Sequence, residues 1–351
     1  MKRRGFIPAT TLLASTVASP ASTATQRKLK VGQIGVAHGH ASKLSVYKQS
    51  DDYEVVGIVE PNTALRERAS GQPAFKDVPW MTQEQLLNYP ELDIVLIETS
   101  PKECLAAAHA SIAAGKHIHL DKPAGESLPQ FEKLLKLAEQ QKLMVQMGYM
   151  YRYNPAMLLL RSMLSQGWLG EIFEVHAVMS KVLPKSDRDS LAIHPGGMMF
   201  ELGCHLVDLV VALLGEPDRV SAHSQHVSGY KDQLKDNMLA VLEYPRAIAS
   251  IKSSAMEVEG FARRHLVVCG TEGTFHIQPL DNPAVRLALS KPRGDYKVGY
   301  QDVELPKYSR YVADAADMSQ VIRGQKQNDY SYQHDLAVQR TVLKASAISL
   351  A

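Results

Sequence analysis

Between residues 28 and 148 short apolar runs alternate with helix-like segments, and this alternation constrains the fold more than any other feature. The apolar runs span 30–35, 53–59, 94–97, 117–120 and 144–148. Strands that alternate with helices pair in parallel, because each crossover returns the chain to the same edge of the sheet. The sequence therefore predicts an α/β fold that begins with a doubly wound Rossmann domain over residues 28–150.

Local signals mark where several of these helices begin and end. Thr82 with Gln85 and Ser127 with Gln130 have the spacing of capping boxes, in which two side chains satisfy the free N–H groups of the first turn. A further helix, predicted over 103–114, is followed by Gly115, a residue that suits a left-handed helix end. The connections are short, as a doubly wound fold requires.

After Asn154-Pro155 the pattern changes. A helix over 156–166 and a strand over 172–178 precede an irregular stretch and a long apolar helix over 199–214. Strand-like runs then follow one another without helices between them, which is typical of an antiparallel sheet. These runs span 219–227, 238–244, 247–253, 264–269 and 274–277, and helices over 313–323 and 333–349 end the chain. We predict a second α/β domain over 151–351, built on a largely antiparallel sheet.

The N-terminus has the outline of a secretory signal peptide. Lys2, Arg3 and Arg4 precede a weakly apolar run and then small residues up to position 24. The paired arginines resemble a twin-arginine signal, so we predict that residues 1–24 direct export of the folded protein to the periplasm. If the segment is instead a basic N-terminus without a signal function, the protein is cytoplasmic.

Composition bounds the class of protein. Hydrophobic residues make up 45% and charged residues 22% of the 351, a balance typical of soluble globular proteins. Removal of Lys2, Arg3 and Arg4 changes the formal charge from +2 to −1, so we predict no nucleic-acid partner. No further apolar run is long enough to span a membrane. The three cysteines Cys104, Cys204 and Cys269 are widely spaced, which favours buried free thiols.

The first predicted strand ends in a loop where a dinucleotide fold holds its phosphates. The loop reads Gly35-Val36-Ala37-His38-Gly39-His40, in which Ala37 and His40 replace the second and third glycines of the G-x-G-x-x-G fingerprint. Taken alone, it could equally be a plain strand-to-helix turn. His38 and His40 could also be metal ligands, but no third ligand is identifiable nearby in the sequence, so we predict no metal site.

Glu60 supports the nucleotide interpretation, because it ends the second predicted strand 25 residues after Gly35. A carboxylate there accepts hydrogen bonds from the adenosine ribose and repels a 2′-phosphate. We therefore predict NAD as cofactor in preference to NADP.

Two further segments carry candidate catalytic groups. Lys122, in Asp121-Lys122-Pro123, follows a strand and is expected at the carboxyl edge of the sheet, where open α/β folds bind ligands. On the long apolar helix Glu201, His205 and Asp208 are spaced to share one face. Ionisable groups on a buried face are costly unless they are paired or functional, which leaves a structural ion cluster as the alternative.

These segments resemble the Gfo/Idh/MocA family, which includes glucose-fructose oxidoreductase and inositol 2-dehydrogenase. In that family Glu-Lys-Pro follows the fifth strand, and a glycine-rich segment with Asp-x-x-x-His opens a helix of the substrate domain. Here Asp121-Lys122-Pro123 stands for the first, and Gly196-Gly197-Met198 with Glu201 and His205 for the second. The resemblance extends to the segments at 114–117, 151–155, 169–172, 214–217, 270–273 and 335–349.

The resemblance implies roles for particular residues. Lys122 would contact the reacting hydroxyl, His205 would act as acid/base, and Glu201 would orient the substrate or the histidine. An imidazole suits removal of the hydroxyl proton during hydride loss, and an ammonium suits the developing alkoxide. The predicted cofactor-binding residues are Gly35, Val36, Ala37, His38, Gly39, His40, Glu60, Thr99, Ser100, Asp121, Lys122 and Arg152, and the predicted substrate-binding residues are Tyr149, His194 and Asp208.

The sequence thus favours a dehydrogenase or reductase that acts on a CH–OH group of a sugar, sugar derivative or inositol. A redox-neutral NAD-dependent glycosidase or lyase of the same family is the alternative, as is a non-catalytic sugar- or nucleotide-binding protein. A zinc enzyme using Glu201, His205 and Asp208 lacks the Cys or His partners that such sites collect. Polar residues of the irregular stretch, Lys181, Lys185, Asp187, Arg188 and His194, are predicted to line the substrate cleft. The resemblance implies a homo-oligomer, dimer or tetramer.

Overall fold

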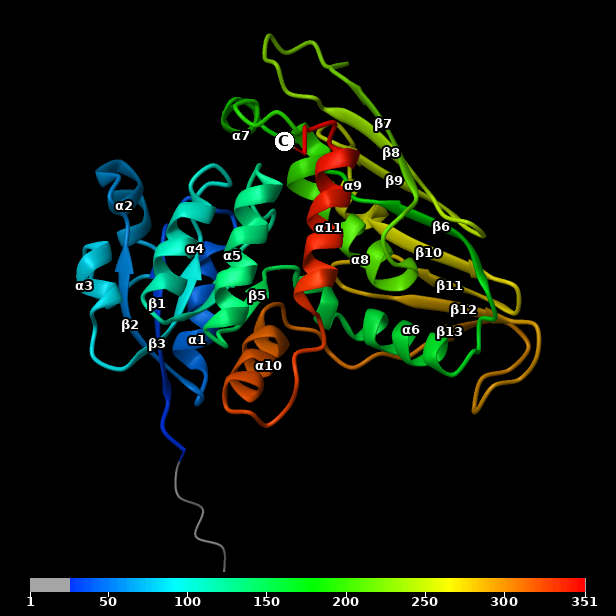
Figure 1. Cartoon of the computed structure of the whole chain (residues 1–351). Coiled ribbons are helices and arrows are strands. Elements are labelled where there is room, and N and C mark those ends of the chain that lie inside the picture. The colour runs from blue at the N-terminus through cyan, green and yellow to red at the C-terminus, as the bar shows by residue number, and fades with distance from the viewer. Residues whose placement is uncertain (1–25, 351) are drawn as a thin grey trace, which may run out of the picture.

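The computed structural model describes residues 26–350, so the predicted signal peptide lies outside the described residues. Two sheets stand side by side, with helices between them and on the outer side of the first (Figure 1). None of the helices within 26–350 has the length and apolarity needed to cross a membrane.

The first domain is built on a parallel sheet with the strand order β2-β1-β3-β4-β5. Its strands are β1 (Leu29–Ile34), β2 (Tyr53–Val59), β3 (Leu92–Ile97), β4 (His117–Leu120) and β5 (Val145–Met147). Its helices are α1 (Leu44–Gln49), α2 (Thr63–Ser70), α3 (Gln83–Leu87), α4 (Cys104–Ala113) and α5 (Leu128–Gln140). The central strands are buried almost continuously because helices cover both faces, which explains their unbroken apolar runs. The predicted Rossmann sheet is confirmed.

The predicted helix signals are also present in this domain. Thr82 accepts a hydrogen bond from Gln85 N while the Gln85 side chain accepts one from Thr82 N, which completes the capping box. Ser127 caps α5 through Gln130 N. Gly115, after α4, has φ +73°, a left-handed conformation that residues with a Cβ rarely adopt.

The second domain is built on an eight-stranded sheet with the order β13-β12-β11-β10-β6-β9-β8-β7. Its strands are β6 (Ile172–Val178), β7 (Arg219–Gln225), β8 (Asn237–Glu243), β9 (Ile248–Ser254), β10 (His265–Gly270), β11 (Gly273–Ile277), β12 (Val285–Leu289) and β13 (Gly299–Val303). Every pair is antiparallel except β6 with β9, which pair in parallel. The antiparallel prediction holds for the sheet as a whole, whereas β12 and β13 were missing from the sequence prediction.

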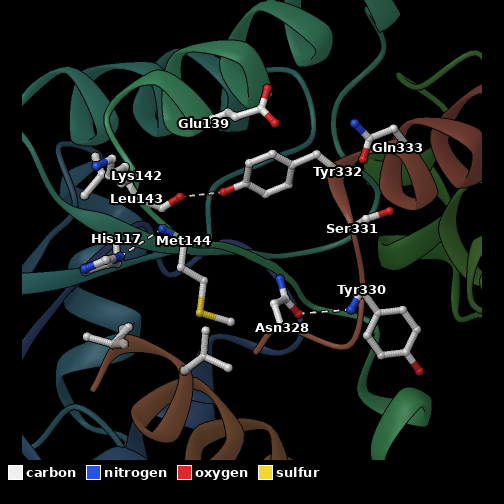
Figure 2. Close-up of a pocket in the computed structure, with 12 residues that line it drawn as sticks. His117, Glu139, Lys142, Leu143, Met144, Asn328, Tyr330, Ser331, Tyr332 and Gln333 are labelled. Carbon is white, nitrogen blue, oxygen red and sulfur yellow. Dashed lines mark hydrogen bonds between the residues drawn. The ribbon is translucent and has the colours of Figure 1, made fainter. Parts of the chain in front are cut away.

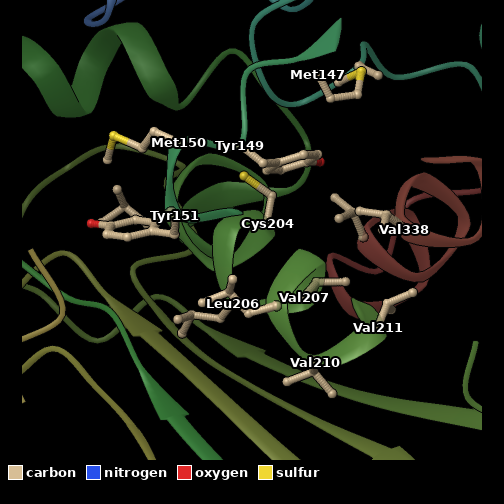
Figure 3. Packing of buried hydrophobic residues seen from close by; sticks show 14 of the residues in the cluster. Met147, Tyr149, Met150, Tyr151, Cys204, Leu206, Val207, Val210, Val211 and Val338 are labelled. Carbon is tan, nitrogen blue, oxygen red and sulfur yellow. The ribbon is translucent and has the colours of Figure 1, made fainter. Parts of the chain in front are cut away.

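The remaining helices are α6 (Pro155–Ser165), α7 (Lys185–Leu191), α8 (Cys204–Leu214), α9 (Gly260–Arg263), α10 (Val312–Ile322) and α11 (Tyr332–Ala345). Of these helices, α8 and α11 pack on the second sheet, and α11 also contacts the first domain. In Figure 1, α11 lies between α5 of the first domain and α8 of the second, and it contacts both. Figure 3 shows the apolar side chains of α8 packed with Val338 of α11 and Tyr149. One hydrophobic core therefore extends across both sheets.

The predicted helix over 199–214 begins differently from expectation. Met199–Gly203 forms a π-helical turn, and regular α-helix starts at Cys204. The wider turn changes the angular spacing between Glu201 and the residues that follow it, so the three ionisable side chains of this segment reach different partners.

Helix α10 returns to the first domain and packs beside α1 and β2. Ala315 and Met318 join the core around Tyr47 and Tyr53, and Tyr53 donates a hydrogen bond to Ala315 O at 2.6 Å. On the same helix Asp314 is buried, and its Oδ1 has no hydrogen-bond partner among the described residues. Burial raises the pKa of Asp314 to about 7, although the positive charge of Lys43 opposes that shift.

The pKa of Asp314 leads to a prediction about stability. The unfolded carboxyl has its ordinary pKa of 3.8, so the folded state favours the protonated form. The contribution of Asp314 to the free energy of unfolding is therefore fully present below about pH 4 and is lost as the pH rises to about 7. Asp314→Asn should therefore stabilise the protein more at pH 8 than at pH 5, by roughly 2 to 3 kcal/mol. Urea unfolding of Asp314→Asn at both pH values checks this, with the exposed Asp302→Asn as control; equal gains at both pH values would contradict it.

Candidate active site

The loop after β1 is held close to the loop after β3. Gly35 has φ +91°, and a Cβ added there would lie 2.6 Å from Thr99 N and 2.7 Å from Glu98 O. His38 N donates a hydrogen bond to Glu98 O at 3.1 Å. Only glycine fits this position. Gly35 and Thr99, both predicted at the nucleotide site, are therefore neighbours, while Ser100 turns its hydroxyl to Glu103 at 2.8 Å.

A cavity of about 580 Å³ opens at the carboxyl ends of β1 and β2. Gly35, Ala37, Glu60 and Thr99 line it, together with Arg66. Glu60 Oε2 accepts a hydrogen bond from Val36 N at 3.1 Å, and its Oε1 accepts one from Asn62 N at 2.9 Å. The position of the cavity and the carboxylate in its wall fit the adenosine half of a dinucleotide, whose ribose hydroxyls such a carboxylate binds.

Beside this cavity lies a cluster of buried ionisable groups centred on Lys43. Its Nζ lies 2.6 Å from Asp121 Oδ2, 2.9 Å from Glu98 Oε1 and 2.8 Å from His119 Nε2. Burial opposes the charge on Lys43, but the two carboxyl groups outweigh it and raise the pKa of the lysine. Burial and the negative charge of Asp121 raise the pKa of Glu98. The ammonium thus stays charged in a site closed to water.

Sequence reasoning missed Lys43 altogether. The sequence shows only that Lys43 lies one turn after His40, at the start of the first crossover helix. That position does not distinguish it from a surface lysine. His38 and His40, by contrast, do lie at the predicted place. Their Nδ1 atoms are 3.4 Å and 3.3 Å from the carboxylate of Asp121, and burial lowers the pKa of His40 to about 4.

The side chain of Lys122, in the first domain, contacts the second domain. Its Nζ donates hydrogen bonds to Glu201 O at 2.8 Å and to Glu201 Oε1 at 3.1 Å. Burial opposes its charge, but the carboxylate of Glu201 outweighs that effect and raises the pKa of Lys122. An ammonium has three donors, so one remains for another acceptor. The structure therefore brings together two of the three predicted catalytic residues.

His205 lies close to the same point, on the first turn of α8. Its ring is buried against Tyr151, His40 and Tyr149, with ring centroids 5.2, 5.8 and 6.0 Å away. Its Nδ1 has no hydrogen-bond partner among the described residues. Burial and the positive charge of Lys122 lower the pKa of His205 well below its ordinary value. A neutral imidazole is a proton acceptor, as a base at this position requires.

Asp208 and Arg152 bind each other in the domain interface. Arg152 Nη2 lies 2.6 Å from Asp208 Oδ1 and 2.7 Å from Asp335 Oδ1, and the guanidinium stacks on Tyr330 with 4.0 Å to the ring centroid. All three charged side chains are buried. Arg152 and Asp208 therefore belong to a buried network of ion pairs that joins α8 to α11. Direct contact of either residue with a ligand stays a prediction.

The irregular stretch before α8 contains a short helix, α7, that the sequence did not predict. Arg188 on α7 is fully buried in ion pairs with Asp232 at 2.7 Å and Asp236 at 2.8 Å. Its predicted place in the substrate cleft is therefore wrong, because its guanidinium anchors α7 to the loop before β8. His194 lies 2.8 Å from Glu126 of the first domain, which places it at the domain boundary.

A second cavity, of about 400 Å³, lies at the opposite edge of the Rossmann sheet (Figure 2). His117 at the start of β4 and Tyr332 at the start of α11 line it. His117 Nδ1 accepts a hydrogen bond from Met144 N at 2.9 Å. Since ligands of open α/β sheets bind at the carboxyl ends of the strands, this cavity is not the nucleotide site.

Family models match both halves of the chain. Residues 29–149 match the model described as an oxidoreductase family with an NAD-binding Rossmann fold. Residues 157–276 match the GFO/IDH/MocA C-terminal domain. Together the two models cover more than half of the chain.

Individual relatives agree with the models. The uncharacterised oxidoreductase YdgJ of Escherichia coli is 27% identical over 292 residues, which cover 78% of this chain and 79% of that protein. The trans-1,2-dihydrobenzene-1,2-diol dehydrogenase of Bos taurus is 26% identical over 227 residues, which cover 63% of this chain and 65% of the relative.

Two solved structures share the fold. A Desulfitobacterium hafniense oxidoreductase described as NADPH-dependent superposes with a TM-score of 0.79 at 18% identity, over 92% of this chain and 96% of that one. An Agrobacterium radiobacter oxidoreductase in complex with NAD+, L-tartaric acid and magnesium gives a TM-score of 0.77 at 16% identity, over 92% and 97%. At these identities the likeness is one of fold.

Proposed function

Because the chain belongs to the GFO/IDH/MocA oxidoreductase family, we propose that it oxidises a CH–OH group of a sugar, sugar derivative or inositol with NAD+, or reduces the corresponding carbonyl with NADH. The observation that carries the proposal is the convergence of Lys122 and His205. They come from different domains, yet both lie at the carboxyl edge of the Rossmann sheet, next to the dinucleotide loop.

The proposed chemistry assigns each side chain a task. Bound NAD+ supplies the hydride acceptor. His205 accepts the proton of the substrate hydroxyl, for which its neutral ring is suited. Lys122 donates its third N–H to the same oxygen and stabilises the negative charge that develops there. Glu201 fixes the position of the Lys122 ammonium through the hydrogen bonds at 2.8 and 3.1 Å.

The substrate class is a further part of the proposal. Bos taurus trans-1,2-dihydrobenzene-1,2-diol dehydrogenase is named for a cyclic substrate with neighbouring hydroxyls. Around His205 the rings of Tyr149 and Tyr151 form an apolar wall beside the charged pair of Lys122 and Glu201. A ring with an apolar face and hydroxyls on its edge suits this combination, and sugars and inositols have that form.

The exposed face of the eight-stranded sheet is the proposed surface for self-association. Leu239, Ile248 and Tyr300 are exposed there on three different strands. These side chains are spread across the face and would be covered in an association through it, so we propose a homo-oligomer that packs through this sheet face, as the family resemblance implies.

Glu60 gives the test of the cofactor preference. Its carboxylate in the cavity wall should repel a 2′-phosphate, so wild-type protein should bind NADH at least about tenfold more tightly than NADPH, which corresponds to about 1.4 kcal/mol. Glu60→Gln should reduce this preference, because Arg66 on the same cavity wall can then pair with the phosphate. Calorimetric titration of both nucleotides into both proteins checks the expectation.

The control for this experiment is Glu84→Gln, which removes an exposed carboxylate in the nearby helix α3. It should leave the ratio of the two dissociation constants unchanged. Equal or tighter binding of NADPH by the wild-type protein would overturn the NAD preference. If the wild-type protein bound neither NADH nor NADPH, the proposed function would be overturned.

A further inference from the structure

We propose that His38, His40 and Asp121 form a binding site for a zinc-class divalent cation at the carboxyl edge of the Rossmann sheet. The three side chains come from the loop after β1 and from the end of β4. One candidate ligand atom from each lies within 4.8 Å of the other two. Two imidazoles and one carboxylate are a donor set that zinc accepts in sites with an open coordination position.

The distances between donor atoms fit a metal of that size. His38 Nδ1 is 3.4 Å from Asp121 Oδ2, and His40 Nδ1 is 3.3 Å from Asp121 Oδ1. In a tetrahedral zinc site with bonds of about 2.0 to 2.1 Å, neighbouring ligand atoms are about 3.3 Å apart. Nitrogen and oxygen at 3.3–3.4 Å are also somewhat long for a charge-assisted hydrogen bond, which is normally about 2.7–2.9 Å.

The hydrogen bonding of His38 supplies a second, independent observation. His40 N donates to His38 Nδ1 at 3.3 Å, so this Nδ1 holds a lone pair. The same Nδ1 faces the carboxylates of Asp121 at 3.4 Å and Glu98 at 3.9 Å. An imidazole nitrogen and carboxylate oxygens at these distances are held together by a proton on the nitrogen or by a bound cation, and a cation would satisfy His38, His40 and Asp121 at once. In addition, His38 Nε2 is buried without a partner among the described residues, as expected when the ring is fixed by its other nitrogen.

Lys43 explains why the proposal concerns these three residues and not their neighbours. Glu98, His119 and Asp121 also gather donor atoms within metal-binding range. The Lys43 ammonium already lies among them at 2.6–2.9 Å, however, and occupies the position that a cation would take. Lys43 also contacts Asp121 Oδ2, but within residues 26–350 no ammonium or guanidinium forms a hydrogen bond with His38 or His40.

The site borders open space at two of its three side chains. The His40 side chain is 18% exposed, and His38 lines a cavity of about 230 Å³ together with Gly39 and Ser42. A metal site needs such an entry path. His40 also lies beside His205, with 5.8 Å between ring centroids, so a cation here would adjoin the proposed catalytic base.

Metal content tests the proposal directly. Full-length wild-type protein incubated with Zn²⁺ and then separated from free metal should hold about one equivalent per chain, because three preformed ligands retain a cation that isolated surface groups release. His38→Ala and His40→Ala should each hold at least tenfold less. His176→Ala is the matched control, since it removes an exposed histidine that pairs with Glu174 on the sheet, and it should retain the wild-type amount.

A spectroscopic measurement on the wild-type protein keeps the test independent of whether the variants fold. Co²⁺ added in place of Zn²⁺ should give the intense visible absorption of a tetrahedral ion. The proposal is overturned if wild-type protein binds no stoichiometric Zn²⁺, if Co²⁺ gives only the weak spectrum of its hydrated form, or if folded His38→Ala retains metal. None of these readouts uses NADH, so their failure is distinguishable from failure of the proposed function.

Discussion

His205→Ala should lower the turnover number by about 100- to 10,000-fold, the range expected when a general base is removed. In the proposed site this imidazole is the neutral group that faces the substrate hydroxyl, and its pKa is lowered by burial and by Lys122. The affinity for NADH should change little, because the adenosine cavity is lined by other residues. Stopped-flow turnover, NADH titration and thermal unfolding on the same preparation separate these quantities.

A matched histidine distinguishes catalysis from folding. His265 on β10 is half-buried and contacts His276, and it lies in the second sheet outside the proposed site. His265→Ala should therefore keep wild-type turnover even if its melting temperature falls. A His205→Ala protein that is less stable but fully active would discard the catalytic assignment.

The order of strands and helices in the first domain could be predicted because neighbouring residues in the sequence carry the signals for each element. Each central strand is buried on both faces, so its apolar run is continuous, and the helix starts carry their own capping side chains. The strand β12 alternates buried Val285, Leu287 and Leu289 with more exposed residues, a signal that the sequence prediction missed, whereas β13 has no comparable pattern. The strand β13 lies at the edge of the second sheet, is largely exposed, and its apolar residues do not alternate with polar ones.

Site residues that belong to sequence motifs were predicted, whereas contacts between residues far apart in the sequence were not. Lys122 and His205 were identified from two separate motifs, and the structure brings both to one edge of the sheet. The partners of Asp208 could not be read from helical spacing, because Arg152 and Asp335 belong to other elements. Likewise Asp121 follows His40 by 81 residues, so the sequence offered no third ligand for the two histidines.

Lys122→Ala should reduce turnover about as strongly as His205→Ala, by about 100- to 10,000-fold. The Lys122 ammonium forms an ion pair with Glu201, and its loss also leaves that carboxylate without this partner in a largely buried site. Lys122→Arg should not restore activity. A planar guanidinium cannot replace a compact ammonium that bonds Glu201 at 2.8 and 3.1 Å and the substrate oxygen together.

Lys116→Met is the matched control for the loss of a lysine. Lys116 lies just before β4, at the other end of the strand that leads to Lys122, and its Nζ donates to Leu92 O at 3.0 Å. This variant should keep wild-type turnover. Substantial rescue by Lys122→Arg would contradict the proposed contact between the ammonium and a single substrate oxygen.

The central claim is that Lys122 and His205 flank one substrate hydroxyl beside the nicotinamide, and a crystal structure of the wild-type protein with NADH measures this arrangement without knowledge of the substrate. The account predicts nicotinamide C4 at the edge of a space between Lys122 Nζ and the His205 ring, with room for a carbon atom about 3 to 3.5 Å from C4. A nicotinamide ring bound elsewhere, or one separated from His205 by the Lys122–Glu201 pair, would contradict it.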